Sequence, residues 1–419
     1  MANERQGGED VRWTAIAVRL AVAVAIFALA LSAGELAAYL KLRYKPTRRV
    51  GESVKTEVFK GASWTSQYFA DFNASSPVRY HSYTLWRRAP FNGKTIKIDS
   101  QGIRETYYSH CDVKAPTIWM FGNSALWGSG TPDWATIPSL VAEEFGKAGE
   151  PVCVKNFGEK AWVTTQEVIA LMVELKRATR PPNVVVFYDG TTDAYLPYET
   201  SEPDVHDNFD AVRRKFEDNT SSAPGFQYLK KTNTYILLNQ WVRNLGLRDP
   251  LQPVRITSPE EAAAMAKVTV DNYVKNMDLV DLLGSHYGFH AFYFWQPTVR
   301  AGSKPLTANE DQMRQEEEST QPGSEIVFKE TYKLIGEARR SNFYDLADFF
   351  ADHPETLFVE TNHLGPEGNS LIAHKMLETI VESGAIPLNG IHGGKVSLDN
   401  SGKALHDQPP SAMARVALR

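Results

Sequence analysis

The sequence predicts an α/β protein with a parallel central sheet covered by helices on both faces, preceded by an apolar N-terminal segment. Short apolar runs typical of buried strands alternate with helix-like segments through the middle of the chain. Such strands read as nearly continuous apolar stretches because helices cover both faces of a parallel sheet. The third observation is the charge-free stretch Leu20–Ala33 near the N-terminus.

The composition is that of an ordinary globular protein. The chain has 419 residues, of which 42% are apolar and 23% charged. This length is enough for one large core with insertions or for two modest domains. The net charge of −5, with acids and bases intermixed, gives no electrostatic case for binding nucleic acid.

Residues 13–40 are expected to form a transmembrane signal anchor after a short tail at 1–12. Within this range only Arg19 and Glu35 are charged. The uninterrupted apolar core is short for a spanning helix and would also suit a signal peptide, with cleavage after Ala28-Leu29-Ala30 or Ala30-Leu31-Ser32. We favour the uncleaved anchor, because Arg19 can snorkel and the amphipathic stretch Leu36–Leu40 extends the segment.

Two signals disagree about orientation. Three basic residues precede the span (Arg5, Arg12 and Arg19) and five follow it (Lys41, Arg43, Lys45, Arg48 and Arg49), which by the positive-inside rule puts the large domain in the cytoplasm. Of the two cysteines, Cys111 lies just before the expected core strand 117–121, and Cys153 lies at the start of the expected core strand 152–157. They could form a disulfide in an oxidising compartment, or be two reduced, buried thiols.

The chain after the anchor divides into three parts. Residues 41–110 are polar and aromatic-rich and are expected to form a β-containing prelude, with strands at 78–86 and 95–98, that packs on the main domain. The main domain covers 111–396, and the polar tail 397–419 is expected to be disordered.

In the main domain, strands are expected at 117–121, 152–157, 183–188, 290–295 and 357–360, and helices at 137–146, 165–179, 262–287, 325–340 and 366–383. The helix-prone stretch 201–264, with helices at 209–218 and 232–245, interrupts the alternation and is expected to form a lid or substrate wall. Residues 297–324 are expected to be irregular.

Ser124 follows the first core strand in the turn Gly122-Asn123-Ser124. A serine there lies at the carboxyl end of a strand, where open α/β sheets bind their ligands. The turn also leaves backbone N–H groups near the hydroxyl, which is what an oxyanion needs. The alternative is a serine that serves only a tight turn or a helix cap.

A carboxylate and a histidine lie three residues apart after the last expected strand, at Glu360 and His363. At this spacing on one tight turn the carboxylate can reach Nδ1 of the imidazole, which leaves Nε2 free to take a proton from a serine hydroxyl. The alternative is a capping loop histidine beside a solvated glutamate. Together with Ser124, the pair favours a serine nucleophile and its base.

Four segments, Phe121–Ser124, Asn156–Gly158, Tyr188–Ala194 and His363–Asn369, resemble in order the four blocks of SGNH (GDSL-type) hydrolases. The resemblance covers roughly Gly102 to Ala385, and Phe294-Trp295-Gln296-Pro297 is similar to membrane-anchored bacterial members. It implies a flavodoxin-like three-layer α/β/α domain. It also implies that Ser124 is the nucleophile, that its N–H and that of Gly158 bind the oxyanion, and that His363, held by Glu360, is the base.

The chain departs from the family pattern at two positions. Thr192 occupies the slot of an asparagine that usually donates to the oxyanion, and a hydroxyl offers one hydrogen where an amide offers two. Thr192 itself, or Asn123 beside the nucleophile, could supply this donor. Glu360 replaces the usual aspartate, which moves the carboxylate by about one methylene.

The resemblance predicts a membrane-anchored serine esterase with an extracytoplasmic domain, acting on O-acyl esters, foremost acetyl esters, of a cell-envelope glycan or lipid. Two alternatives remain open: an O-acetyltransferase that uses the same triad beside polysaccharide-export machinery, and a non-catalytic glycan-binding or scaffold protein. No metal or cofactor is expected, because a serine mechanism supplies its own nucleophile. Asp189 and Asp193 are expected to cap a turn.

Overall fold

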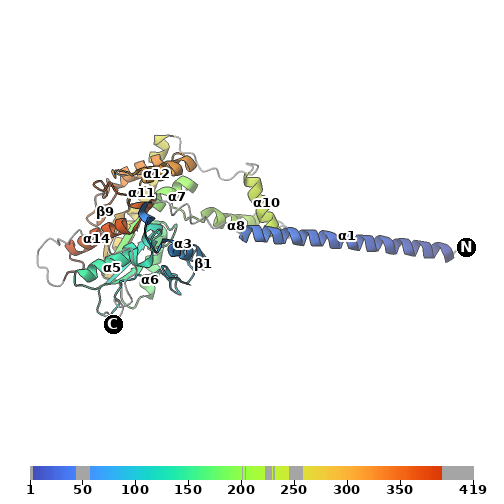
Figure 1. The fold of residues 1–419 in the computed structure, drawn as a ribbon, viewed down its shortest axis with the longest axis horizontal. Helices are drawn as coiled ribbons and strands as arrows, with labels where there is room; N and C mark the ends of the chain where they lie inside the picture. Colours follow the sequence, from blue (N-terminus) through green and yellow to red (C-terminus); the bar gives the residue numbers. More distant parts are fainter. Residues whose placement is uncertain are drawn as a thin grey trace. The chain divides into compact units, whose positions relative to one another are not determined.

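The computed structural model describes residues 3–43, 57–200, 202, 204–221, 229, 232–244 and 258–388. The expected disordered tail at 397–419 lies outside these residues. The chain forms two compact units: unit 1 holds Met1–Arg48 and Asp210–Gln252, and unit 2 holds the rest. Unit 2 carries the sheet, and unit 1 carries the apolar N-terminal helix (Figure 1).

The central sheet of unit 2 has five parallel strands in the order β6-β5-β7-β8-β9. Their bounds are β5 (Thr117–Gly122), β6 (Cys153–Asn156), β7 (Val184–Asp189), β8 (His290–Trp295) and β9 (Phe343–Asp345). Counted along the sheet this order is 2-1-3-4-5, the flavodoxin-like arrangement, which confirms the predicted fold class. The chain first adds β6 on one side of β5 and then adds β7, β8 and β9 on the other side, so the order in which strands are added reverses between β5 and β7.

Helices cover both faces of this sheet. Alternate residues of each strand point to opposite faces, so each strand contributes to two cores. On one side Ile118 and Met120 pack against α5 (Ile137–Lys147) and α14 (Pro366–Glu382). On the other side Trp119 and Phe121 pack in a second core. The helices α6 (Thr164–Arg177), α11 (Pro259–Tyr287) and α13 (Ser324–Ile335) supply the rest of that core. The result is a three-layer α/β/α domain, and Figure 1 shows α5 and α14 together.

Two predictions in this domain were wrong. The strand expected at 357–360 does not join the sheet: β10 (Phe358–Glu360) pairs antiparallel with β11 (His363–Leu364), and β9 takes the fifth place. The stretch 297–324 is not irregular throughout, since α12 (Ala308–Thr320) lies within it and begins with a Thr307–Glu310 capping box. This helix is polar all round, so it gives no apolar periodicity.

Glu310 of α12 explains how the hairpin is held beside the sheet. Its side chain is fully buried, and its carboxylate accepts hydrogen bonds from the backbone N–H groups of Leu357 (3.0 Å) and Phe358 (3.2 Å). Lys304 neutralises the carboxylate at 2.8 Å. The helix missed in the sequence therefore fixes the strand that leads to Glu360.

The prelude contains more helix than expected. After η1 (Glu57–Phe59) it forms α3 (Thr65–Ala74) and two short hairpins, and the strand expected at 78–86 is split in two. The strands are β1 (Val78–His81), β2 (Leu85–Arg88), β3 (Phe91–Asn92) and β4 (Lys97–Ile98). Trp64 and Tyr68 of this region pack with Trp127 and Trp134 of the main domain in a third core.

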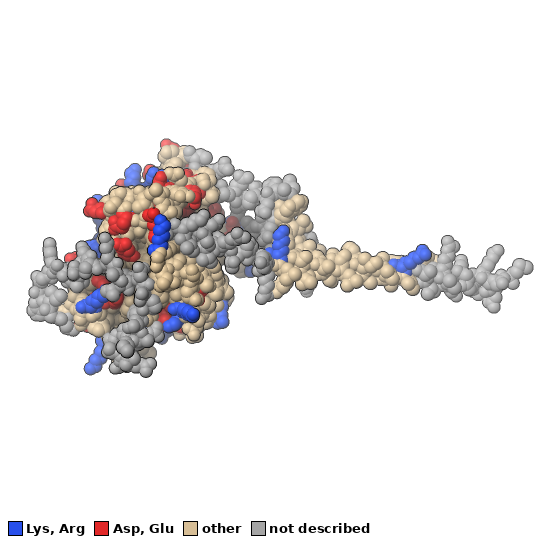
Figure 2. All heavy atoms as spheres, in the orientation of Figure 1, with Lys and Arg blue, Asp and Glu red and all other residues tan. Residues whose placement is uncertain are grey.

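The N-terminal helix α1 runs from Asn3 to Arg43, so residues 3–12, expected as a tail, are helical. Its segment Ile16–Lys41 is long and apolar enough to cross a membrane, and most of its side chains are exposed. Figure 2 shows this uncharged surface between basic side chains. The insertion helices α8 (Phe209–Ser221) and α10 (Asn233–Asn244) belong largely to the same unit, and α10 packs on α1.

A disulfide joins Cys111, at the start of the main domain, to Cys153, the first residue of β6, across 42 residues of sequence. Closing a loop of this length restricts the unfolded chain, so we expect the Cys111→Ser/Cys153→Ser variant to lose about 2–4 kcal/mol of unfolding free energy. Urea denaturation of the oxidised wild type and the variant measures the difference. Equal midpoints would show that the bridge does not constrain the unfolded chain.

Candidate active site

Ser124 lies where the topology of the sheet reverses. β5 ends at Gly122, Asn123 caps the next helix, and Ser124 opens the short helix α4 (Ser124–Trp127). Gly122 is required at the end of β5, because a Cβ there would lie 2.2 Å from the carbonyl oxygen of Tyr188 on β7. The serine is thus held at the carboxyl ends of β5 and β7, at the crevice that this sheet order creates.

Ser124, His363 and Glu360 form one continuous chain of hydrogen bonds. Ser124 Oγ lies 2.7 Å from His363 Nε2, and His363 Nδ1 lies 2.6 Å from Glu360 Oε2. Glu360 and His363 are cross-strand partners in the β10–β11 hairpin, which brings the two side chains together. With Nδ1–H donating to the carboxylate, Nε2 is the acceptor for the serine hydroxyl.

The three members of this chain differ in exposure. Ser124 and His363 are each 8% exposed, whereas the side chain of Glu360 is 52% exposed. Removal from water strengthens the interaction between serine and imidazole. The Glu360 carboxylate is partly exposed to solvent, which screens its charge.

Gly158, a predicted oxyanion donor, lies against the helix that carries the serine. A Cβ on Gly158 would lie 2.6 Å from the backbone nitrogen of Trp127, so only glycine allows this approach. Its N–H donates to the side-chain oxygen of Asn156 at 3.0 Å. The N–H of Ser124, at the first position of α4, has no acceptor inside the helix.

Asn123 and Thr192, the other predicted donors, are placed differently. Asn123 Nδ2 donates to Gln296 Oε1 (2.6 Å) and to Thr191 Oγ1 (3.3 Å), so both amide hydrogens are used in this conformation. Its Oδ1 accepts from the N–H of Ala125 at 2.9 Å, as the cap of α4. Thr192 is 9% exposed in the first turn of α7 (Thr191–Thr200), a helix that the sequence did not predict.

A polar network behind the serine was missed in the sequence. Gln296 Nε2 donates to the backbone oxygen of Asn362 (3.3 Å), and Asn362 Nδ2 donates to Thr191 Oγ1 (3.2 Å). With Asn123, these residues join the ends of β5, β7 and β8 to the turn that carries His363. The available signal was that Gln296 directly follows the last residue of β8, as Asn123 follows β5.

The serine helix is also held at its carboxyl end. Arg104 is 1% exposed, and its guanidinium donates to the carbonyl oxygens of Trp127, Gly128 and Thr131 at 2.7–2.9 Å. Its Nε pairs with Asp133 at 2.8 Å. The guanidinium thus satisfies carbonyl groups that a helix end leaves without partners.

Replacing Arg104 with Met is expected to lower the unfolding free energy by about 3–5 kcal/mol, because it leaves the buried Asp133 carboxylate unpaired. Thermal or urea unfolding measures the loss. Arg104→Met/Asp133→Asn is the matched control and should recover part of it, since the second change removes the uncompensated charge. A single variant as stable as the wild type would contradict the assignment.

Three buried carboxyl groups lie beside the third sequence block. They are Glu167 on α6, Asp189 at the end of β7 and Asp193 on α7. Asp193 caps α6 by accepting from the N–H and hydroxyl of Thr164, and Asp189 accepts from Tyr273 at 2.7 Å. Within the described residues, no group of His, Cys, Asp and Glu has the arrangement that holds a metal ion.

Burial disfavours the charged forms of this cluster. It raises the pKa of Asp193 to about 8 and that of Asp189 to about 6, and it raises the pKa of Glu167 well above its usual range. The negative charge of Asp189 adds to the shift of Asp193. The folded protein therefore binds protons here that the unfolded chain releases near pH 4.

This difference predicts that stability falls as the pH rises between about 6 and 8. The raised pKa values give the folded state more bound protons than the unfolded state, so the slope is negative, about 1.4 kcal/mol per pH unit for each proton. Urea unfolding at pH 6, 7 and 8 tests this. In Asp193→Asn, which keeps an oxygen for Thr164, the slope should be shallower, and an unchanged slope would contradict the assignment.

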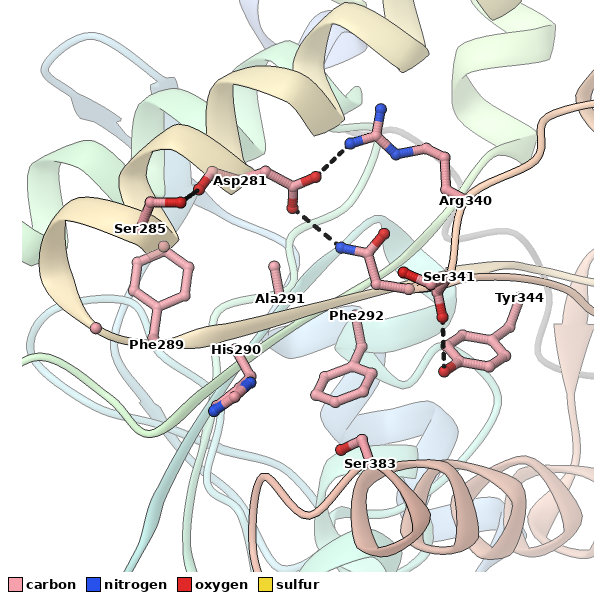
Figure 3. A pocket seen from close by; sticks show the side chains of 13 residues that line it. Asp281, Ser285, Phe289, His290, Ala291, Phe292, Arg340, Ser341, Tyr344 and Ser383 are labelled. Carbon is pink, nitrogen blue, oxygen red and sulfur yellow. Dashed lines mark hydrogen bonds and ion pairs between the residues drawn. The ribbon is translucent and has the colours of Figure 1, made fainter.

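A cavity of about 880 Å³ opens at the other end of the strands (Figure 3). It is lined by His290, the first residue of β8, by Tyr344 of β9 and by the end of α11. Arg340 at its rim pairs with Asp281, which also accepts from Asn342 at 3.0 Å. Because Ser124 lies at the carboxyl ends of the strands, this cavity is separate from the candidate active site.

No family model matches the chain, and no curated protein matches it. Solved structures similar to it include a lipolytic protein of the G-D-S-L family from Veillonella parvula (16% identity, 63% of this chain and 97% of that one, TM-score 0.32). Others are an acetyl xylan esterase (12%, 62% and 97%, TM-score 0.34) and the lipase/acylhydrolase from Enterococcus faecalis (16%, 64% and 96%, TM-score 0.33).

Proposed function

We propose that this protein is a membrane-anchored serine esterase of the SGNH type that hydrolyses O-acyl esters. The observation that carries the proposal is the hydrogen-bond chain from Ser124 through His363 to Glu360 at the carboxyl edge of the sheet. A serine, an imidazole and a carboxylate within hydrogen-bond reach of one another are the parts that nucleophilic acyl transfer needs.

The reaction begins with attack of Ser124 Oγ on the ester carbonyl carbon, while His363 Nε2 takes the hydroxyl proton. The carboxylate of Glu360 stabilises the imidazolium that forms. His363 then gives the proton to the departing alcohol, which leaves an acyl group on Ser124. Water, deprotonated by the same nitrogen, releases the carboxylic acid and restores the serine.

The negative oxygen of the tetrahedral intermediate would be bound by the N–H groups of Ser124 and Gly158. To bind this oxygen, the Gly158 N–H has to give up the hydrogen bond that it donates to the side chain of Asn156. Thr192, in the slot of the family's asparagine, is proposed as a third donor through its hydroxyl. One oxyanion donor is worth about 10²–10³ in rate, so two N–H groups with a weaker hydroxyl donor are expected to give slower catalysis than three strong donors.

The proposed substrates are acetylated glycans or lipids of the cell envelope, with the catalytic unit outside the cytoplasm and next to polysaccharide-modifying machinery. The disulfide between Cys111 and Cys153 supports an oxidising compartment. The excess of basic residues after the span argues for the opposite orientation. Cysteine-accessibility labelling of intact cells at the exposed position Val113 decides between them.

The proposal is tested by treating the full-length protein with a fluorophosphonate, mapping the adduct by mass spectrometry, and assaying p-nitrophenyl acetate hydrolysis. We expect one adduct, on Ser124, and loss of hydrolysis after labelling. No adduct and no hydrolysis would instead support a binding or scaffold protein. An adduct with acetyl transferred to an added glycan, rather than released as acetate, would identify an O-acetyltransferase.

A further inference from the structure

Glu35 lies within the apolar helix α1 and holds the beginning of α10. Its carboxylate accepts from the N–H and side-chain amide of Asn233, at 2.5 and 2.7 Å. It also accepts from the N–H and hydroxyl of Thr234, at 2.9 and 2.8 Å. All four donors belong to the first two residues of α10, so Glu35 caps this helix from another segment of the same unit.

This junction removes two costs that would be large outside water. A carboxylate within a membrane helix is costly unless it finds partners. The first N–H groups of α10 have no acceptors inside their own helix, and they form its positive end. In water both the carboxylate and these N–H groups can bond with solvent. In a bilayer there is no water to bond with, so each supplies the hydrogen-bond partner of the other.

The part of α1 that packs on α10 also contains a small buried residue. Ala38, one turn after Glu35, is 5% exposed, whereas most of the span is open. Small residues let helices approach closely in membranes, where packing and hydrogen bonds, rather than the hydrophobic effect, drive association. Glu35 is therefore the contact with α10 on a helix whose surface is otherwise mostly open and apolar.

Three apolar side chains of α10 are exposed. Ile236, Leu238 and Trp241 are 38%, 54% and 58% exposed. In the last turns of α1, Leu36 (58%) and Leu40 (55%) are also exposed. Exposed apolar side chains thus lie on both of these packed helices of unit 1, and exposed apolar patches mark membrane or protein contacts.

We propose that α10 is a second membrane element, lying in the bilayer interface beside the anchor, with its apolar side chains among the lipids. Its 12 residues give a length of about 18 Å, too short to cross the hydrocarbon core but suitable for an interfacial helix. Trp241 suits the boundary between acyl chains and headgroups, where tryptophan is enriched. The inference rests on α1 crossing the bilayer and is independent of the esterase chemistry.

The test places a fluorophore at single cysteines in the full chain, reconstituted in phosphatidylcholine vesicles with and without doxyl-labelled lipid. The native cysteines form a disulfide, so under non-reducing conditions only the introduced thiol reacts. Leu238→Cys reports on α10, Phe27→Cys on the centre of the span, and Val113→Cys on the water-exposed surface of unit 2.

We expect at least twofold quenching at positions 27 and 238 and little at 113. Quenching at 27 but not at 238 would overturn the proposal while leaving the anchor intact, and would point to a protein partner or water around α10. In a Glu35→Ala background, quenching at 238 should fall by half or more while that at 27 is unchanged. Unchanged quenching at 238 would overturn the role of Glu35.

Discussion

Replacing His363 with Ala is expected to lower kcat for p-nitrophenyl acetate by about 10⁵–10⁶-fold, with little change in KM. Nε2 of His363 is 2.7 Å from Ser124 Oγ and is the only base that the structure brings to this hydroxyl within the described residues. Without it the hydroxyl keeps its proton and is a poor nucleophile. Steady-state kinetics and the rate of fluorophosphonate labelling both measure the loss.

Ser124→Ala and the double variant Ser124→Ala/His363→Ala are the matched comparisons. Residues that act as a unit in covalent catalysis are strongly non-additive, so the double variant should lose no more than either single variant. The losses would instead multiply if the two residues acted in separate steps. A His363→Ala enzyme that still labels at the wild-type rate would show that another group activates Ser124.

The strands β5, β6, β7 and β8 could be predicted because their signal is local. Each is a short apolar run, and burial on both faces of a parallel sheet requires this of the residues themselves. β9 was not predicted because it has three residues, of which only Phe343 is buried. α7 was not predicted because Pro197 lies inside it, and an internal proline argues against a helix.

The core of the candidate site could also be predicted, because its decisive geometry is short-range. Glu360 and His363 are three residues apart, and the hairpin that pairs them keeps that relation. Gln296 and Thr191 could not be assigned, since their contacts with Asn123 depend on which strands are neighbours in the sheet. Sequence spacing says nothing about such contacts across 68 or 173 residues.

The insertion shows why a sequence expectation based on position is weaker than one based on pattern. Its place between β7 and β8 suggested a lid over the strand ends, yet α10 groups with the N-terminal helix. The pairing depends on Glu35, which in the sequence is only an isolated charge in an apolar segment. Its meaning appears when the four donors of Asn233 and Thr234 are found around it.

Replacing Glu360 with Gln is expected to lower kcat by about 10²–10⁴-fold while leaving KM within a few-fold of the wild type. The carboxylate, 2.6 Å from His363 Nδ1, selects the tautomer with Nε2 free and stabilises the imidazolium in the transition state. Loss of the corresponding carboxylate in a buried triad costs about 10⁴. The side chain of Glu360 is 52% exposed, and solvent screening places the expected loss toward the lower end.

Glu360→Asp separates charge from reach. Aspartate keeps the charge but is one methylene shorter, and a shift of about 1 Å in a positioned group can cost about 10²-fold. We expect the kcat of Glu360→Asp to lie between those of the wild type and Glu360→Gln at low ionic strength, where charge acts over a longer distance. If Glu360→Gln instead matches the wild type in both kcat and labelling rate, His363 is oriented by other contacts and the triad reduces to a Ser124–His363 dyad.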